Sequence, residues 1–571
     1  MTARNEALLV TAACLVLYLT GLGDVPFHTR GEPREGLVVQ EMQRTGSWLV
    51  PMRPHGIPTR KPPAYYWAAS ITFAVLPDRP ELALRLPSAL LATLAVLVTW
   101  LVVRRTVEPA AALPAALVLA TSFEWTRAAV SARVDMTLAA ALTGVFAALA
   151  VALERPSPRT TLLGAAARAT AVLAKGPVGI VLPCAAVLAF AGLQRNARLP
   201  LQLRLPHMVG LAVVLCSFWY LAAWARLGPE FLDVVLRENV GRFVDTDAAD
   251  TGHAHGPFYL LGLGLVGLLP WTLLLPLVLA PFRMRTPGRP VLSFAAVWSI
   301  VVVVFFSLAT SKRSVYLLPA FPAIALLLGA GGVRPPVARL GRLLRASAAL
   351  YVPGLVLLAA CAAALAMGVA VGGLVTPWLR PTDAVGASAV GAAAADAAVV
   401  VAVLVGLSAL GAVVIARGRA RARWRDVILA LAVVTIVWVA AFDAVVHPAI
   451  GRTRSLAPFM QRVDGLVPPD AVLHAFFPPD PGLRFYAPRE VRRVRDGAPE
   501  TARYLLLWED EWREWRDADG RPLRALAVSE AEPSSRGALA LVLAPPGALR
   551  RGTAPPPAGE PGLRVPPVQN G

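Results

Sequence analysis

The chain is poor in charged residues, in cysteine and above all in lysine. Only 16% of its 571 residues are charged and 56% are hydrophobic, whereas a soluble protein carries charge on roughly a quarter of its residues. This composition excludes a soluble globular enzyme. The cysteines lie in apolar stretches without Cys-x-x-Cys spacing, which excludes a disulfide framework and a thiolate metal site and predicts small core residues. They are Cys14, Cys184, Cys216 and Cys361.

Long apolar runs recur from Leu8 to Val446. They predict an α-helical polytopic membrane protein, because about 20 apolar residues in a helix cross a bilayer. We expect about 13 transmembrane helices, some of them short or tilted. Their approximate limits are 6–23, 82–103, 109–126, 134–153, 160–174, 176–193, 206–226, 258–281, 290–308, 314–332, 348–372, 389–416 and 426–446.

Arginine is concentrated in alternate loops between these spans, and such loops stay in the cytoplasm. The N-terminus is therefore predicted to be cytoplasmic and, because the number of spans is odd, the C-terminus to lie outside. The first apolar segment lacks a small-residue cleavage site and is expected to be a retained span. The net charge of +19 then reflects topology and attraction to anionic lipid headgroups, not nucleic-acid binding. The arginine-rich loops follow the second, fourth, sixth, eighth, tenth and twelfth spans.

The predicted membrane domain covers residues 1–447, and its first outer loop, 24–81, is long enough to hold surface helices. One begins near Glu32-Pro33-Arg34-Glu35, because proline suits the first turn of a helix, and it continues with an apolar periodicity typical of a helix on a membrane surface. The other, Pro62–Leu76, is apolar but too short to span comfortably, and its aromatic residues fit the membrane interface.

The rest of the chain changes character and predicts a small α/β domain on the outer face over residues 448–551, followed by a disordered tail, 552–571, that is dense in proline and glycine. Three short apolar runs are expected to form strands. They are Ala471–Phe477, Tyr504–Trp508 and Ala538–Leu543.

The three lysines, Lys61, Lys175 and Lys312, all fall at span ends on the predicted outer face. Arginine serves elsewhere wherever a positive charge is needed, so a retained lysine indicates a site that requires a compact, movable ammonium group. The alternative for each lysine alone is simple snorkelling to the interface. A cationic cluster at headgroup level suits a phosphorylated lipid, whose leaving phosphate must be stabilised as a bond breaks.

Several carboxylates and two histidines share this face. Asp135 opens an apolar span, where an ionisable group is costly unless it is paired or functional; alternatively it caps its helix or pairs with Arg133. Glu32 and Glu35 are candidate catalytic acids or bases, although they also fit an ordinary negative first helical turn. His253 and His255, two residues apart, form a candidate for a divalent metal site, or else a solvated loop pair.

One ordered series of motifs runs through residues 20–330. It comprises Glu32-Pro33-Arg34, Glu41-Met42, Gly46-x-Trp48-x-x-Pro51, Lys61-Pro62-Pro63-x-Tyr65-x-Trp67, Arg85-x-Pro87, Arg133-x-Asp135, Lys175-Gly176-Pro177, Glu238-Asn239-x-x-Arg242-Phe243, Pro257-Phe258-Tyr259, Leu269-Pro270-Trp271 and Ser311-Lys312-x-x-x-Tyr316-x-Leu318-Pro319. This series resembles the bacterial lipid A aminoarabinose transferases and, more distantly, the protein O-mannosyltransferases, which are GT-C integral-membrane glycosyltransferases.

The resemblance implies a GT-C fold, a polyprenyl-phosphate sugar donor and transfer on the periplasmic face with inversion at the sugar carbon. It implies that Lys61 and Arg242 hold the donor phosphate and that Asp135 belongs to the active site. Two positions depart from the family pattern. Gly31 stands where the family has an aspartate, so that acidic position is absent or its task has passed to Glu32 or Glu35. Arg60 stands where the family has a glutamate that can bind metal. A divalent metal is therefore only a possible cofactor, and no other cofactor is expected.

The chain is therefore predicted to be a glycosyltransferase of the bacterial inner membrane that acts on lipid A, another glycan or a protein. Two alternatives stay open: a transporter or flippase of lipid-linked sugar, and a catalytically inactive homologue that only binds the lipid. The predicted catalytic residues are Glu32, Glu35 and Asp135; the phosphate-binding residues are Arg34, Lys61, Lys175, Arg242 and Lys312; the acceptor-binding residues are Tyr65, Glu238 and Tyr316.

Overall fold

The computed structural model describes most of the chain, and two compact units are evident in it. The described residues are 2–59, 61–229, 231, 255–256, 258–283, 288–310, 312–334, 338–368, 381–487, 489–494, 502–514, 523–530 and 537–544. The first unit contains residues 1–25, 35–371 and 390–448, and the second contains residues 26–34, 372–389 and 449–571. The tail predicted to be disordered, 552–571, lies outside the described residues.

The first unit is an assembly of helices, and a helix occupies each of the thirteen segments in which the sequence predicts a span. These helices are α1 (Ala3–Leu19), α4 (Pro80–Thr106), α5 (Pro109–Ala120), α7 (Val134–Glu154), α8 (Pro158–Lys175), α9 (Val178–Leu193), α11 (Leu205–Leu227), α14 (Tyr259–Gly267) with η4 (Trp271–Arg283), α15 (Arg289–Leu308), η5 (Ser314–Ala320) with α16 (Phe321–Gly332), α18 (Tyr351–Ala366), α21 (Ala398–Ala420) and α22 (Trp424–Ala441).

Among the described residues, eight helical segments are long and apolar enough to cross a membrane, and α14 with η4, bent by 97°, would add a ninth. Helices α5 and α9 are apolar but shorter. The chain is thus an integral membrane protein of α-helical class, as predicted, while the total of thirteen spans stays a prediction.

The bundle is held together by one continuous apolar core. Helix α4 packs against α1, α5 and α7, and α7 packs in turn against α8. Small residues permit close approach: a Cβ on Gly179 of α9 would lie 2.6 Å from the backbone nitrogen of Val172 in α8, so only glycine fits this crossing. Of the cysteines, Cys14 and Cys216 are buried as predicted, but Cys361 is exposed on α18, so the prediction of a core role is wrong for Cys361.

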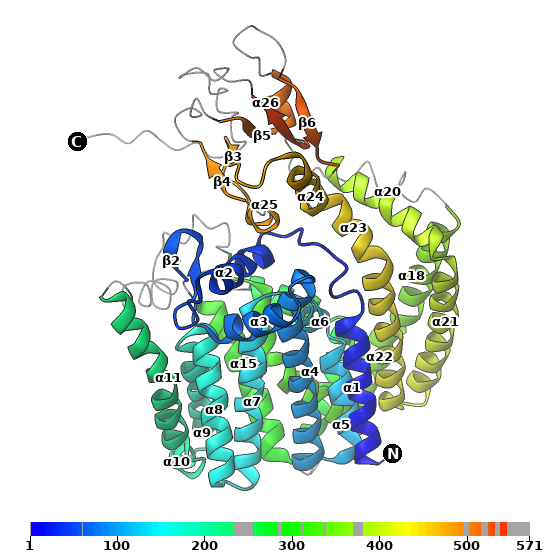
Figure 1. The fold of residues 1–571 in the computed structure, drawn as a ribbon. Coiled ribbons are helices and arrows are strands. Elements are labelled where there is room, and N and C mark those ends of the chain that lie inside the picture. Colours follow the sequence, from blue (N-terminus) through cyan, green and yellow to red (C-terminus); the bar gives the residue numbers. More distant parts are fainter. Residues whose placement is uncertain are drawn as a thin grey trace, which may run out of the picture. The chain divides into compact units, whose positions relative to one another are not determined.

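Shorter elements complete the first unit. Helices α2 (Gly31–Thr45) and α3 (Ala64–Val75) confirm the two helices predicted in the first loop, and they lie across one end of the bundle (Figure 1). A hairpin of two strands joins them. The remaining elements of this unit are β1 (Met52–Arg53), η1 (Pro54–Gly56), β2 (Ile57–Pro58), α6 (Phe123–Ala129), α10 (Leu199–Gln202), α17 (Ala338–Ala349) and the π-helix η7 (Phe442–Val446). Helices α20 (Pro381–Asp396) and α23 (His447–Arg454) contain residues of both units.

The ion pairs formed by arginine and by lysine lie at opposite ends of the bundle. At the end where α1 begins, Arg104 pairs with Glu6 at 2.9 Å and Arg334 pairs with Glu108 at 2.6 Å. Asp135 and Lys175 lie at the opposite end, because α7 begins and α8 ends there, as the alternating helix directions require. The arginine-rich and lysine-containing segments are thus separated along the helix axes.

The second unit is built on a five-stranded mixed sheet with strand order β4-β3-β5-β7-β6. The three predicted strands are present as β3 (Leu473–Ala475), β5 (Tyr504–Trp508) and β7 (Leu539–Leu543), and the structure adds β4 (Val491–Arg493) and β6 (Ala525–Val528). Helices α24 (Ala457–Leu466), α25 (Pro481–Tyr486) and α26 (Glu509–Glu514) accompany the sheet. Its central strands are almost wholly apolar, and Leu505, Leu506 and Leu541 are completely buried.

Candidate active site

The first part of the candidate site is an ion pair between Lys61 and Glu35. The Lys61 Nζ lies 2.6 Å from Glu35 Oε1, and the Tyr66 hydroxyl donates a hydrogen bond of 2.5 Å to Glu35 Oε2. The Glu35 side chain is 4% exposed and that of Lys61 is 22% exposed. Both carboxylate oxygens are therefore occupied, which fixes Glu35 and holds the ammonium at the edge of the bundle. Buried carboxylates are retained only with such partners.

The second part is an ion pair between Lys175 and Asp135. The Lys175 Nζ donates a hydrogen bond of 2.5 Å to Asp135 Oδ1 and lies 4.5 Å from the centre of the Tyr316 ring. Asp135 is in the first turn of α7 and Lys175 is the last residue of α8, so each charge has the sign that its helix end favours. Gly176, at φ +80°, then ends α8 in a conformation that favours glycine.

The two pairs act on one another. The carboxylate of Asp135 interacts electrostatically with the positive charges of Lys175, Lys61 and Arg133. Helix α3, which follows Lys61, packs against α7 and α8, and η5, which carries Tyr316, packs against α7. Among the described residues, the positive charges of Lys61, Lys175 and Arg133 thus outnumber the carboxylates of Glu35 and Asp135 in these pairs, a balance that suits an anionic ligand.

Lys312, the third lysine, is differently placed. It is 6% exposed and its Nζ donates a hydrogen bond of 2.6 Å to the carbonyl of Ala309. Ala309 follows α15, so the ammonium caps the C-terminal end of that helix, where a cation is favoured. No carboxylate pairs with Lys312 in the part of the chain that the structure describes.

A further ion pair was not anticipated from the sequence. Glu124, buried in α6, accepts hydrogen bonds from Arg127, and an Arg127 nitrogen also donates to the Ser314 hydroxyl at 3.2 Å. Ser314 begins η5, the element that carries Tyr316. The only signal in the sequence is an i, i+3 pair of opposite charges, which is common on exposed helices, and only burial distinguishes Glu124.

Other predicted residues are not members of these ion pairs or are not described. Tyr65 is completely buried and donates to the carbonyl of Leu84 at 2.9 Å, so it is the adjacent Tyr66 that reaches Glu35. At the start of α2, Glu32 is buried and Arg34 is exposed. Two predicted site residues, Arg242 and Glu238, lie outside the described residues, as does Arg60.

The predicted metal site depends on a histidine pair of which only one member is described. His255 is exposed and stacks on the Tyr259 ring at 3.8 Å between centroids, while His253 lies outside the described residues. No group of three or more metal-binding side chains occurs in the described segments. Metal binding therefore stays a prediction.

Comparison with known proteins confirms the resemblance that the motifs indicate. Residues 60–224 match the family described as dolichyl-phosphate-mannose-protein mannosyltransferase. The chain is 30% identical over 330 residues to an uncharacterized protein of Aquifex aeolicus, with 57% of this chain and 63% of that protein covered. It is 30% identical over 377 residues to an undecaprenyl phosphate-α-4-amino-4-deoxy-L-arabinose arabinosyl transferase of Pectobacterium carotovorum, with 64% of this chain and 66% of that protein covered. The chain thus spans less than two thirds of these relatives.

The fold is shared more completely than the sequence. The structure of ArnT from Cupriavidus metallidurans bound to undecaprenyl phosphate superposes with a TM-score of 0.74 at 22% identity, and the match covers 95% of this chain and 98% of that chain. The predicted GT-C fold with a small C-terminal sheet region is confirmed.

Proposed function

We propose that the protein is an integral-membrane glycosyltransferase that transfers a sugar from a polyprenyl-phosphate donor to lipid A or to another glycan or protein acceptor. The relatives named as arabinosyl transferases and the shared fold support this reaction class. The observation that carries the proposal is the pair of lysines at one end of the bundle, Lys61 and Lys175, each held by a carboxylate with little exposure, Glu35 or Asp135.

The lysines bind the phosphate that joins the sugar to the lipid. When the bond between the anomeric carbon and the phosphate oxygen breaks, its electron pair stays on that oxygen, and the phosphate changes from a singly charged diester to a more highly charged monoester. Lys61 and Lys175 stabilise this growing charge, and such preorganised electrostatic stabilisation is commonly the largest contribution to catalysis. Arg242 and Lys312 remain further candidates for phosphate contacts.

The carboxylates have two tasks. Glu35 and Asp135 position the ammonium groups before the donor arrives, so that little reorganisation is needed during the reaction. If the acceptor is a hydroxyl, one of them also accepts its proton. If the acceptor is itself a phosphate, the attacking oxygen is already anionic and no base is needed. Attack from the face opposite the leaving phosphate inverts the anomeric carbon.

The proposed location is the bacterial inner membrane, with the N-terminus in the cytoplasm and the residue 448–551 domain in the periplasm. The separation of arginine-rich and lysine-containing ends along the helices supports this orientation, because positive loops stay in the cytoplasm. The active site then faces the periplasm.

Transfer of a labelled sugar from its lipid carrier in purified membranes tests the proposal. Product formation by the wild type that is lost in Lys61→Ala supports it. Movement of the carrier lipid across reconstituted vesicles without any transfer would instead favour a flippase. Saturable donor binding without turnover would identify a catalytically inactive binding protein.

A further inference from the structure

The short helix η5 carries Tyr316 to the candidate active site, although its own hydrogen bonds can fix it only weakly. It is a 3-10 helix of 7 residues, Ser314–Ala320, with Pro319 inside it. The hydrogen bonds of 3-10 helices have poor geometry, and runs longer than about four residues are uncommon. Contacts with neighbouring helices therefore determine the position of η5 and of the Tyr316 ring.

Side chains from two other helices anchor the ends of η5. At its beginning, an Arg127 nitrogen of α6 donates a hydrogen bond of 3.2 Å to the Ser314 hydroxyl. Near its end, the indole N–H of Trp298 in α15 donates a hydrogen bond of 2.8 Å to the carbonyl of Pro319. Between these anchors, the Tyr316 ring packs at 5.2 Å between centroids against another ring of α15, that of Phe306. The ring is thus placed by contacts at both ends of η5 and on one face.

Glu124 holds the guanidinium of Arg127 in the orientation that the first anchor requires. Arg127 Nε donates to Glu124 Oε2 at 3.0 Å, and Nη2 donates both to Glu124 Oε1 and to the Ser314 hydroxyl. The two nitrogens bind the carboxylate as a bidentate pair, which leaves the second hydrogen of Nη2 for the serine. The Glu124 side chain is 4% exposed, and a Cβ on Gly267 of α14 would lie 3.0 Å from the Glu124 Cβ. Close packing therefore fixes the carboxylate as well.

These contacts close a ring through the candidate active site. Arg127 in α6 and Asp135 in α7 belong to adjacent helices of the first unit. Asp135 pairs with Lys175, whose ammonium group lies 4.5 Å from the centre of the Tyr316 ring. Ser314, on the same short helix as that ring, leads back to Arg127. A shift of η5 therefore changes how the ring shields the ammonium group.

A comparison within the chain separates this ion pair from an ordinary helical one. Arg44 and Glu41 on α2 have the same i, i+3 spacing, and two nitrogens of Arg44 likewise bind the carboxylate. The Arg44 side chain is 72% exposed, against 41% for Arg127, and its guanidinium bonds only Glu41 within the described residues. Exposed pairs of this kind contribute little to stability. The bond to a second element is what gives Arg127 a role in the site.

We propose that Glu124 and Arg127 are positioning residues for glycosyl transfer, which act through η5 by holding the Tyr316 ring against the ammonium group of Lys175. The inference rests on the proposed function, to which it adds two residues that act through others. Arginine suits this task because its planar fork binds the carboxylate through two nitrogens and keeps a hydrogen for the serine, whereas lysine is a point charge on a flexible stem.

Acetylation of lysines in the full-length protein in detergent tests the geometry without turnover. The chain has three lysines, so peptide mass spectrometry resolves the rate at each, and Lys61 serves as the internal reference. Ser314→Ala removes the anchoring hydrogen bond but breaks no ion pair. We expect Lys175 to be acetylated about two- to fivefold faster in this variant and in Tyr316→Leu, because the ring no longer shields the ammonium group.

The transfer assay follows the same path by a double-mutant cycle. Ser314→Ala should lower kcat/KM about two- to tenfold, the range expected for one hydrogen bond. In the Tyr316→Leu background the same substitution should cause no further loss. Glu124→Gln combined with Arg127→Gln leaves no buried charge without its partner, and this double variant should behave as Ser314→Ala does.

Ser347→Ala is the matched control, because it removes a 2.8 Å hydrogen bond from a serine of α17 to the carbonyl of Leu273 in η4. It should change neither the acetylation of Lys175 nor the transfer rate. Equal losses from Ser314→Ala with and without the Tyr316 ring would overturn the proposal, since the serine would not act through the ring. Unchanged acetylation of Lys175 in Ser314→Ala would overturn it too, as would the same changes in the control.

The two proposals fail separately. A wild type that transfers no sugar would refute the proposed function. The acetylation rates would still show whether the anchor holds the ring against the ammonium group, because they are measured without donor or acceptor.

Discussion

The ammonium group of Lys175 lies 2.5 Å from the carboxylate of Asp135, although forty positions separate the two residues in the chain. The pair joins the end of α8 to the beginning of α7 and keeps 21% and 15% of the two side chains exposed. It is therefore shielded enough to be strong and open enough for a ligand to reach. Such a pair either stabilises the bundle or serves the reaction, and the two roles are separable.

Breaking the Asp135–Lys175 pair tests this distinction. Asp135→Asn and Lys175→Met should each lower stability, because either leaves a partly buried charge without its partner. The double variant should recover much of that loss, with a coupling of about 1–3 kcal/mol. Glycosyl transfer should nevertheless stay at least about a hundredfold below the wild type in all three variants, since phosphate stabilisation is lost with Lys175 and positioning with Asp135. Thermal unfolding in detergent and a transfer assay measure the two effects.

The Glu6–Arg104 pair provides the matched control at the opposite end of the bundle. Its nitrogen–oxygen distance of 2.9 Å and exposures of 9% and 25% are similar. Arg104→Gln should lower the melting temperature but leave transfer per folded molecule unchanged. Recovery of both stability and transfer in the Asp135→Asn, Lys175→Met double variant would assign the pair a purely structural role.

Local patterns predicted most of the fold, and packing determined what they missed. Apolar runs mark membrane helices because the bilayer selects them directly. The scarcity of lysine predicted one site for Lys61, Lys175 and Lys312; the structure places the first two in ion pairs with carboxylates and the third on the carbonyl of Ala309, and their role in binding stays a prediction. The choice between Tyr65 and Tyr66 could not be made in this way, since adjacent helical residues point in different directions and only the packing of α3 selects one. Strand β4, Val491–Arg493, has two charged residues out of three and carries no apolar signal.

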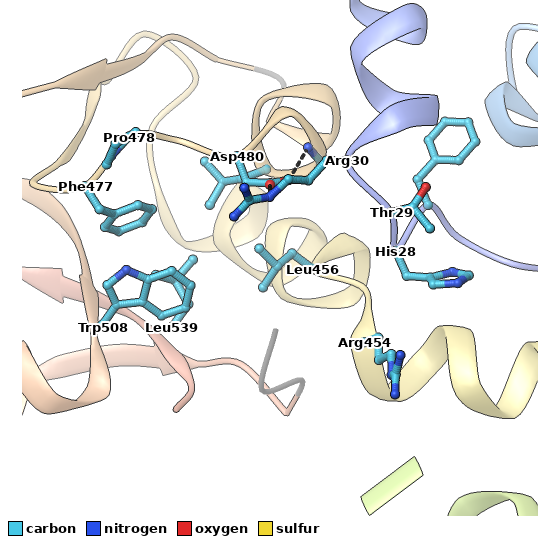
Figure 2. Close-up of a pocket in the computed structure, with 13 residues that line it drawn as sticks. His28, Thr29, Arg30, Arg454, Leu456, Phe477, Pro478, Asp480, Trp508 and Leu539 are labelled. Atoms are coloured by element: carbon cyan, nitrogen blue, oxygen red, sulfur yellow. Dashed lines mark hydrogen bonds and ion pairs between the residues drawn. The ribbon is translucent and has the colours of Figure 1, made fainter. Parts of the chain in front are cut away.

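Features that are formed by residues from distant parts of the chain are the hardest to predict from the sequence. A cavity in the second unit, shown in Figure 2, combines residues 27–30 with residues more than four hundred positions later. Glu124 is similarly hidden, because its pairing with Arg127 has the spacing of an ordinary exposed helical pair. Both depend on tertiary contacts that no local pattern encodes.

Glu35 should matter more than Glu32 for transfer. Glu35→Gln removes the charge that holds Lys61 at 2.6 Å, so we expect an increase of about tenfold or more in the KM for the donor, equivalent to ~1.4 kcal/mol. Glu32→Gln should raise the KM for the donor less. Tyr66→Phe removes one hydrogen bond to Glu35 and should have an intermediate effect on this KM, equivalent to about 0.5–1.5 kcal/mol of donor binding. Donor titrations in the transfer assay give the ranking, and a larger effect of Glu32→Gln would contradict it.

The ring of Tyr316, rather than its hydroxyl, is expected to support Lys175. The ammonium lies 4.5 Å from the ring centre, which is within the range of a cation–π interaction. Tyr316→Phe keeps the ring and should retain the transfer rate. Tyr316→Leu should lower the transfer rate roughly two- to thirtyfold, which corresponds to a lost cation–π interaction of about 0.5–2 kcal/mol. If Tyr316→Phe is as impaired as Tyr316→Leu, the hydroxyl acts directly, as expected for an acceptor-binding residue.

The stability of the sheet unit should fall in mild acid because of His474. Burial lowers the pKa of His474, and the positive charge of Arg492 on the paired strand β4 lowers it further. The unfolded chain, with a histidine pKa near ~6.5, therefore binds the proton more readily than the folded chain. The contribution of neutral His474 to the free energy of unfolding is therefore fully present above about pH 6.5. It decreases as the pH falls through that value toward the lower pKa of the folded state.

Limited proteolysis of the full-length protein between pH 5 and 7.5, followed at cleavage sites in the sheet unit, measures this dependence. The rates should be corrected for the protease's own pH profile with an unrelated substrate. His474→Gln should flatten the curve in the acid range. The same acid sensitivity in the variant would exclude His474 as its origin.

Labelling of single introduced cysteines tests the orientation in the membrane. The parent variant has its four natural cysteines replaced by serine or alanine, and none of these cysteines is in a disulfide. Arg44 on α2 and Arg195 after α9 are both exposed and lie on opposite ends of the helices. A membrane-impermeant maleimide should label Arg44→Cys in intact spheroplasts and Arg195→Cys only after lysis, because the arginine-rich loops stay in the cytoplasm. The reverse labelling pattern would place Lys61 and Lys175 at the cytoplasmic face of the membrane. The donor would then have to be bound from the cytoplasmic leaflet, and transfer on the periplasmic face would be excluded.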